Sequence, residues 1–215
     1  MNVVTQLLRY CNGVTPLNHL LIFARHPELG RVKTRLAATI GAEAALAVYQ
    51  ELLHRTRLAA DGLTDVHKTV WFAEATATPN LASMWLGYEQ ALQPNGDLGQ
   101  KMQEAFKQAF AQGAAAAVII GTDCPGFTTT LLAEAFQALT THELVVGPAA
   151  DGGYYLLGMS SLQVDLFRDK PWSTAEVLPA TLADAANLGL SVALLPTLRD
   201  VDTADDLEVW RKAER

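Results

Sequence analysis

Short apolar runs alternate with longer helical patterns along almost the whole chain, and this alternation limits the fold more than any other feature of the sequence. The apolar runs typical of buried strands are residues 20–24, 66–73, 88–93, 116–121, 144–147, 154–159 and 191–195. Continuous apolar strands separated by helices predict an α/β fold, in which helices cover both faces of a mostly parallel central sheet.

The segments between these runs carry the apolar spacing or the start signals of helices. The expected helices are residues 42–60, 81–86, 98–112, 129–139, 161–167 and 174–188, with a terminal helix that ends near residue 212. Residues 1–17 show no strong periodicity, and we expect them to form an N-terminal extension. The remaining length suits one domain, and no repeat, low-complexity tract or linker divides it, so residues 18–215 are predicted to form a single domain.

The loop after the first apolar run concentrates positive charge in a protein that is acidic overall. Lys and Arg number 16 against 23 Asp and Glu, yet Arg25, Arg31, Lys33 and Arg35 lie within one eleven-residue stretch. A strand-to-helix loop offers free backbone N–H groups, and the added cations make it a candidate cradle for phosphates. The alternative is a solvated basic loop that binds nothing. We favour phosphate binding because the loop geometry and the charge agree.

Composition and charge exclude several other classes of function. A net charge of −7 argues against general binding of nucleic acid or anionic membranes, so the basic loop indicates a small phosphorylated ligand. No apolar run approaches the ~20 residues of a membrane span, and no signal-peptide pattern is found. Cys11 and Cys124 form no disulfide framework, so a cytoplasmic location is expected. The five histidines, at positions 19, 26, 54, 67 and 142, show no ligand spacing, so a zinc site is not expected.

Acidic residues follow predicted strands, at the strand ends where ligands bind in sheets of this kind. Asp123 comes soon after the run 116–121, and Asp200 and Asp202 follow the last run. A carboxylate at such a strand end can hold Mg²⁺ or Mn²⁺ on a pyrophosphate. Alternatively, Asp123 is a turn residue that bonds its own backbone, and Asp202 or Thr203 caps the terminal helix.

Asp151 precedes two glycines and two tyrosines. Adjacent glycines let the backbone approach a ligand closely, so Asp151 is a candidate general base, sugar-hydroxyl acceptor or second metal ligand. A hairpin turn with Gly152 and Gly153 at the bend explains the same residues equally well. Tyr154 and Tyr155 lie on opposite faces if they begin a strand, and then only one of them can face the site.

Six segments of the chain match, in order, the motifs of one known family. They are Phe-Ala-Arg-x-Pro-x-x-Gly-x-x-Lys-Thr-Arg-Leu from residue 23, Gly-Asp-Leu-Gly from 96, Gly-Thr-Asp-Cys-Pro from 121, Asp-Gly-Gly-Tyr-Tyr from 151, Trp-Ser-Thr from 172 and Asp-Val-Asp-Thr-x-x-Asp-Leu from 200. The chain thereby resembles a bacterial family of the nucleotide-diphospho-sugar transferase superfamily, whose members are commonly labelled glycosyltransferases and include an arsenosugar-biosynthesis branch. The resemblance covers about residues 18–213, and six ordered motifs argue against chance agreement.

The resemblance implies a fold and a metal site. The fold is a GT-A-like (Rossmann-like) three-layer sandwich in one domain, with one late antiparallel strand in the mostly parallel sheet. Asp123 and Asp202 match aspartates that hold the metal, Mg²⁺ or Mn²⁺, in nucleotidyltransferases of the superfamily; its distant relatives include molybdopterin-guanine-dinucleotide synthases and phospholactate guanylyltransferases. Pro125 stands where an Asp-x-Asp motif has its second aspartate, so metal bound by Asp123 needs a partner distant in sequence.

The resemblance also implies that the Lys and Arg of the opening loop bind the donor phosphates. Together with the residue patterns above, we expect phosphate or nucleotide binding by Arg25, Gly30, Lys33, Arg35 and Asp97, catalysis by Lys33 and Asp151, and a substrate pocket formed by Gly152, Gly153, Tyr154, Trp172, Ser173 and Thr174. Asp97 and Thr174 are in addition candidate helix caps.

We therefore predict a metal-dependent transferase that uses a nucleotide-activated donor. Glycosyl transfer from a nucleoside-diphosphate sugar to a small acceptor is the first choice. One alternative is nucleotidyl transfer from an NTP to a small phosphorylated acceptor, and the other is a nucleotide-binding protein without turnover. No nucleic-acid partner and no membrane span are expected, and the residues do not indicate an oligomeric state.

Overall fold

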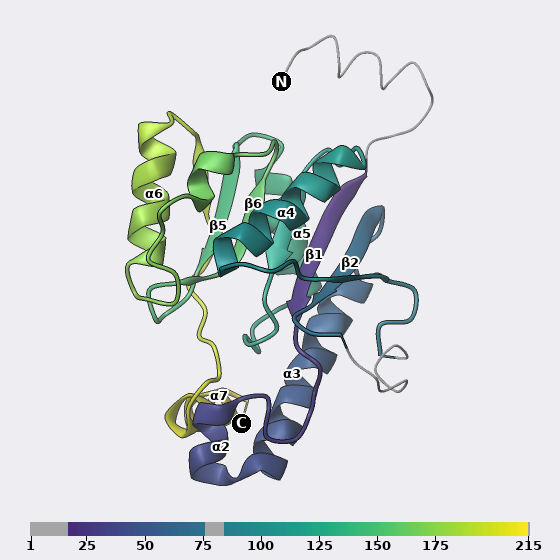
Figure 1. The fold of residues 1–215 in the computed structure, drawn as a ribbon, viewed down its shortest axis with the longest axis vertical. Helices are drawn as coiled ribbons and strands as arrows, with labels where there is room; N and C mark the ends of the chain where they lie inside the picture. Colours follow the sequence, from purple (N-terminus) through teal and green to yellow (C-terminus); the bar gives the residue numbers. More distant parts are fainter. Residues whose placement is uncertain (1–16, 76–83, 215) are drawn as a thin grey trace.

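A seven-stranded sheet forms the centre of the structure, a computed structural model that describes residues 17–75 and 84–214 (Figure 1). The strands are β1 (Asn18–Ala24), β2 (Val66–Phe72), β3 (Glu89–Leu92), β4 (Ala117–Ile120), β5 (Leu144–Pro148), β6 (Tyr154–Met159) and β7 (Val192–Leu194). Their order across the sheet is β3-β2-β1-β4-β6-β5-β7. β6 runs antiparallel to both of its neighbours and the other pairs are parallel, which confirms a mostly parallel sheet with a late antiparallel strand.

Helices cover both faces of this sheet and complete the three layers. They are α2 (Thr34–Ile40), α3 (Ala42–Asp61), α4 (Leu98–Ala111), α5 (Thr129–Ala138), the 3-10 helix η2 (Val164–Phe167), α6 (Val177–Asn187) and α7 (Ala204–Ala213). Successive strand residues point to opposite faces, so Leu20 and Ile22 of β1 pack beneath α3 and α5. Leu21, between them, packs beneath α4, η2 and α6 on the other face.

The last helix closes the fold at the end of the sheet where the parallel strands finish. α7 packs against α2 and the first part of α3, below the strands in the view of Figure 1. Leu36, Leu52 and Trp210 form the small core between these three helices. This packing holds the segment after β7 close to the loop after β1, although about 170 residues separate them in the chain. Among the described residues, no helix is long and apolar enough to cross a membrane.

Two helix caps that the sequence predicts are present. The Asp97 carboxylate accepts a hydrogen bond from the Gln100 backbone N–H at 2.8 Å, and the Gln100 side chain accepts one from the Asp97 N–H at 3.0 Å, so the two residues form a capping box at the start of α4. Thr203 and Asp206 form the same arrangement at the start of α7. These bonds satisfy backbone N–H groups that a helix start leaves without partners.

Two predicted helices differ from the structure. The helix expected at 161–167 is only the short η2, and the helix expected from residue 174 begins at Val177. Thr174 is not the cap of α6, whose N-cap position is Glu176. The Thr174 hydroxyl donates to the Pro171 carbonyl at 2.7 Å and accepts from the Glu176 N–H at 3.3 Å, within a turn that places Ser173 in the left-handed region at φ 64°. The backbone therefore cannot enter the helix until after this turn. The turn expected at 76–80, part of the helix expected at 81–86 and nearly all of the N-terminal extension lie outside the described residues; residues 84–87 form a turn.

Candidate functional site

A cavity of about 700 Å³ opens where β1 and β4 end. Its wall combines the loop after β1, the loop after β4, the first residues of β6, the start of α4 and the segment after β7. Its charged or polar lining residues include Arg25, Arg31, Lys33, Arg35, Tyr49, Lys101, Thr122, Asp123, Tyr154, Tyr155, Ser173, Asp200 and Asp202. The volume is within the range of about 300–1,000 Å³ that is usual for small-molecule sites. The position agrees with the rule that ligands bind at the carboxyl ends of strands in open α/β sheets.

Lys33 lies between the two aspartates that the resemblance assigns to a metal. Its ammonium forms an ion pair with Asp123 and a second one with Asp202, whose Oδ1 lies 2.8 Å from Nζ. The Lys33 side chain is only 4% exposed, whereas the side chains of Asp123 and Asp202 are 49% and 44% exposed. A buried cation thus faces two carboxylates that are open to the cavity.

The environment of Lys33 keeps this side chain charged. Burial alone would lower its pKa, but the charges of Asp123 and Asp202 and their hydrogen bonds outweigh burial, so the pKa is raised above its usual value. The backbone of Lys33 has φ 48°, a left-handed conformation that is unfavourable for a residue with a Cβ. Such strain is common at functional sites, where the surrounding contacts hold it in place.

Asp200 adds a third carboxylate beside this pair. Its Oδ1 is buried and has no hydrogen-bond partner among the described residues. Burial raises its pKa to about 7, and the negative charges of Asp123, Asp151 and Asp202 add to the shift. An oxygen without a partner, surrounded by further carboxylates, is the environment that a bound Mg²⁺ or Mn²⁺ would stabilise, because these ions prefer oxygen ligands. The oxygen donors present suit a divalent metal in kind, but the oxygens of Asp123, Asp200 and Asp202 do not all lie within 4.8 Å of one another, so an ion bound by all three would draw them together.

Backbone and hydroxyl hydrogen bonds hold the three loops of the site together. The Val201 N–H donates to the Asp123 carbonyl at 3.0 Å, which brings Asp200 and Asp202 to the end of β4. The Tyr49 hydroxyl accepts from the Arg25 N–H at 2.9 Å and lies 3.3 Å from the Thr122 hydroxyl. Tyr49 was not among the predicted site residues, although a hydroxyl within the predicted helix 42–60 gives it a polar group that can reach the site.

The arginines of the basic loop form the outer part of the wall. Arg25, Arg31 and Arg35 are exposed and line the cavity, and Arg31 also forms ion pairs with Glu28 at 3.0 Å and with Glu74 at 3.3 Å. Gly30 has φ 74° and supplies the turn between them, but it does not itself border the cavity. Lys101 of α4 is a further lining cation that sequence reasoning missed, although it is one helical turn beyond the Asp97 cap.

The Asp151 turn borders the cavity only through the tyrosines that follow it. Asp151 is exposed and does not line the wall, and its Oδ1 accepts a hydrogen bond from the Gly153 N–H at 2.9 Å. Tyr154 and Tyr155 pack on opposite faces of the sheet, as expected, but both line the cavity. The expectation that only one would do so was wrong, because the cavity surrounds the end of β6 from both faces.

The paired glycines have a packing role. Gly152 has φ 91°, and a Cβ on it would lie 2.5 Å from the Ala175 carbonyl oxygen. A larger residue here would therefore displace the 172–176 segment, which brings Ser173 to the cavity wall.

The start of α4 receives the neighbouring tryptophan. Trp172 packs on Gly99, where a Cβ would lie 2.4 Å from the indole ring. Five of the predicted site residues do not line the cavity in the described structure: Asp97, Gly152, Gly153, Trp172 and Thr174. They can affect the cavity only through the segments that they hold in place. Cys124 lines the cavity, but burial raises the pKa of its thiol to about 12, which keeps the thiol protonated.

The sheet order, the three layers and a cavity at the carboxyl ends of the strands define the nucleotide-diphospho-sugar transferase fold. Residues 54–174 match the family described as "Uncharacterized protein conserved in bacteria (DUF2064)", and the chain belongs to this family. No curated protein matches the chain.

Solved structures support the same fold. A "putative nucleotide-diphospho-sugar transferase" from Desulfovibrio desulfuricans G20 shares 31% identity over 94% of this chain and 89% of its own, with a TM-score of 0.88. A 4-diphosphocytidyl-2C-methyl-D-erythritol synthase from Anaerococcus prevotii DSM 20548 is 9% identical over 93% of this chain and 97% of its own, with a TM-score of 0.62. A protein of Mycobacterium tuberculosis H37Rv in complex with manganese is 18% identical over 93% of this chain and all of its own (100%), with a TM-score of 0.53. The last two similarities concern the fold alone.

Proposed function

We propose that the protein is a metal-dependent transferase that acts on a nucleotide-activated donor, and that it transfers a glycosyl group from a nucleoside-diphosphate sugar to a small acceptor. The observation that carries this proposal is the buried Lys33 ammonium between Asp123 and Asp202, at the wall of a cavity edged by arginines. The Desulfovibrio structure and its description support a nucleotide-sugar donor. A cytoplasmic location and a small-molecule acceptor stay predictions within this proposal.

The carboxylates and the cations would act on different parts of the donor. Asp123 and Asp202, with Asp200 beside them, would hold Mg²⁺ or Mn²⁺, which would neutralise negative charge on the donor pyrophosphate. With this ion between them, Asp123 and Asp202 would no longer need the Lys33 ammonium to balance their charges. Lys33 would then turn to the donor phosphates, with Arg25 and Arg35 at the outer wall. The manganese complex of the distant Mycobacterium protein agrees with the choice of ion.

Nucleotidyl transfer is a second candidate, and the position of Asp151 favours it. The acidic residues on the described cavity wall are Asp123, Asp200 and Asp202, all in the cluster around Lys33. A glycosyl acceptor loses a hydroxyl proton as it attacks and therefore benefits from a separate base. A phosphate acceptor is already an anion and needs only positioning and charge neutralisation. The cytidylyl-type name of the Anaerococcus neighbour fits this second reaction.

Product analysis tests the two reactions directly. The full chain is incubated with Mn²⁺, with panels of nucleoside-diphosphate sugars and of NTPs, and with a mixture of small phosphorylated acceptors that can take a nucleotidyl group, and the products are separated by anion-exchange chromatography. Slow release of a nucleoside diphosphate and free sugar from a nucleotide sugar is the result expected for a glycosyltransferase. Pyrophosphate from an NTP, with every nucleotide sugar left intact, would replace glycosyl transfer by nucleotidyl transfer. A protein that turns over neither panel but is stabilised by nucleotides would be the non-catalytic alternative.

Asp151→Asn separates the two reactions by kinetics. The Asn side-chain oxygen still accepts from the Gly153 N–H, so the turn is preserved. If Asp151 is the base of glycosyl transfer, turnover falls by roughly a hundredfold while nucleotide affinity stays near that of the wild type. Asp165→Asn, a change of another exposed aspartate in η2, serves as the matched control. Equal turnover in the wild type and in Asp151→Asn would remove Asp151 from the chemistry.

A further inference from the structure

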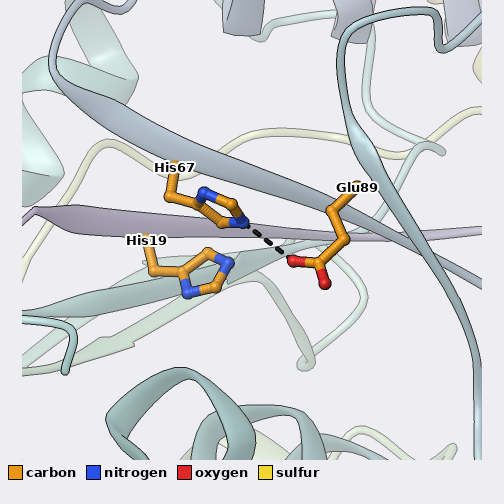
Figure 2. Close-up of side chains that lie close together, drawn as sticks. All are labelled: His19, His67 and Glu89. Carbon is orange, nitrogen blue, oxygen red and sulfur yellow. Dashed lines mark hydrogen bonds and ion pairs between the residues drawn. The ribbon is translucent and has the colours of Figure 1, made fainter. Parts of the chain in front are cut away.

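Two histidines and a glutamate meet on three neighbouring strands (Figure 2). His19 is the second residue of β1, His67 the second of β2 and Glu89 the first of β3. The sheet register pairs His19 with His67 and Thr69 with Glu89, so the backbone ladder fixes where the three side chains begin. The two histidines are 48 residues apart in the chain, which explains why their spacing in the sequence showed no metal-ligand pattern.

The side chains of this cluster converge on the Glu89 carboxylate. In Figure 2 the Nε2 atoms of both imidazoles face Glu89, and the His67 Nε2 lies 2.8 Å from Glu89 Oε2. One donor atom from each of the three residues lies within 4.8 Å of the others. The Thr69 hydroxyl, at the centre of the same face, donates to Glu89 Oε2 at 3.2 Å and lies 2.8 Å from His19 Nε2. Because the hydroxyl gives its one proton to Glu89, His19 Nε2 is the donor of the hydrogen bond to Thr69, so an ion bound at this nitrogen would replace that proton and that bond.

Burial divides the cluster into a protected and an open side. His19 is 4% exposed, and its pKa is lowered to about 4 by burial and by the neighbouring His67, against the opposing effect of Glu89. The side chains of His67 and Glu89 are each 47% exposed. An ion can therefore approach from solvent, and water can complete its coordination.

We propose that His19, His67 and Glu89 form a binding site for a divalent transition-metal ion, with Zn²⁺ favoured. Two imidazole nitrogens and one carboxylate oxygen are the donor set of open zinc sites, whereas Mg²⁺ and Ca²⁺ prefer oxygen ligands throughout. Donor atoms about 2.0–2.1 Å from zinc are closer to one another than 4.8 Å. Rotations of the exposed His67 and Glu89 side chains would bring the donor atoms to these shorter separations without movement of the strands.

This site is separate from the nucleotide cavity. His19 lies four residues before Phe23, the first residue of β1 that lines the cavity, and this is about 13 Å along a strand at about 3.3 Å per residue. A bound ion would join β3, a four-residue strand at the edge of the sheet, to β2 and β1 through side chains. The expected consequence is that the ion stabilises this edge of the sheet.

Zinc binding to the tag-free, metal-stripped full chain tests the proposal. Calorimetry should show Zn²⁺ binding in the wild type, with affinity at least about tenfold weaker in His67→Ala and in Glu89→Gln. Zn²⁺ should also shift the ¹⁵N resonances of the His19 and His67 rings and raise the melting temperature. His54→Ala removes another exposed histidine, on α3, and should bind zinc like the wild type. Circular dichroism checks that His67→Ala and Glu89→Gln, which both change exposed side chains, are folded.

Three outcomes would overturn the proposal: no zinc binding by the wild type, equal affinity in His67→Ala and wild type, or loss of zinc binding in Asp123→Asn alone. The last outcome would place the ion in the nucleotide cavity. The two sites share no residue, so the two proposals are tested independently. A protein that does not bind zinc could still be the proposed transferase, and a protein without transferase activity could still bind zinc at His19, His67 and Glu89.

Discussion

Lys33→Ala is expected to remove the stabilisation of the protein by nucleotides and to lower transferase turnover by about 10²–10³-fold. Lys33 is the buried cation of the cavity wall, and the proposed function places the donor phosphates next to its charge. Charge that is fixed in a partly desolvated position stabilises a leaving pyrophosphate or nucleoside diphosphate much more than an exposed arginine does. The exposed Arg25 and Arg35 are therefore not expected to compensate for the loss.

Thermal shift measures the binding part of this prediction. A nucleotide at a hundred times its dissociation constant stabilises the folded state by about 2.7 kcal/mol, which is about 5–10 °C in melting temperature for a chain of this length. Nucleoside di- and triphosphates with Mn²⁺ should give such a shift in the wild type and not in Lys33→Ala. Lys107→Ala, which removes an exposed lysine from α4, is the control. Equal shifts in the wild type and in Lys33→Ala would exclude Lys33 from the nucleotide site.

The same variant should affect metal binding in the opposite direction. The Lys33 ammonium contacts both Asp123 and Asp202, so it competes with any cation for these two carboxylates. Without it, repulsion between the carboxylates favours a bound ion. Calorimetry without nucleotide should therefore show that Mn²⁺ binds to Lys33→Ala at least as tightly as to the wild type. Weaker Mn²⁺ binding in this variant would contradict a shared position for the ammonium and the metal.

The sequence predicts the fold well where apolar pattern alone decides the structure. Each apolar run became a strand within one or two residues at either end, because a buried strand needs a continuous apolar segment. The antiparallel direction of β6 came from the resemblance to a family, since the residues themselves do not show it. The prediction was wrong at Thr174, because a local turn that includes the left-handed Ser173 delays the start of the helix to Val177.

The sequence predicts only part of the site, and it does so through the order of the strands rather than through the apolar pattern. Loops that follow parallel strands meet at one edge of the sheet, so the proximity of the basic loop, Asp123 and Asp202 could be expected from their order in the chain. Which groups pair within that edge depends on side-chain packing, and the position of Lys33 between the two aspartates was not predicted. The His19 and His67 cluster was missed because it depends on the register between β1 and β2. A one-residue change in that register would move His67 to the other face.

Asp123→Asn is expected to abolish Mn²⁺-dependent nucleotide binding while leaving the fold intact. The Asp123 side chain is 49% exposed and keeps its size and shape in the variant, so packing changes little. Its negative charge is lost, however, and Mg²⁺ or Mn²⁺ binds an uncharged amide oxygen much more weakly than a carboxylate. The Val201 N–H donates to the Asp123 backbone carbonyl, so the variant also leaves Asp200 and Asp202 in place. The effect should therefore fall on the metal and on turnover rather than on the position of the loops.

A set of single variants identifies the ligands by calorimetry with Mn²⁺, in the presence and absence of a nucleoside diphosphate. We expect Asp123→Asn and Asp202→Asn each to weaken Mn²⁺ binding by at least about tenfold, because each removes one charged ligand. Asp205→Asn, which changes an exposed aspartate in the first turn of α7, should bind like the wild type. Unchanged Mn²⁺ affinity in both Asp123→Asn and Asp202→Asn would reject this metal site. If Asp123→Asn alone loses affinity, Asp200 is the expected partner of Asp123, because its Oδ1 is buried and has no hydrogen-bond partner among the described residues.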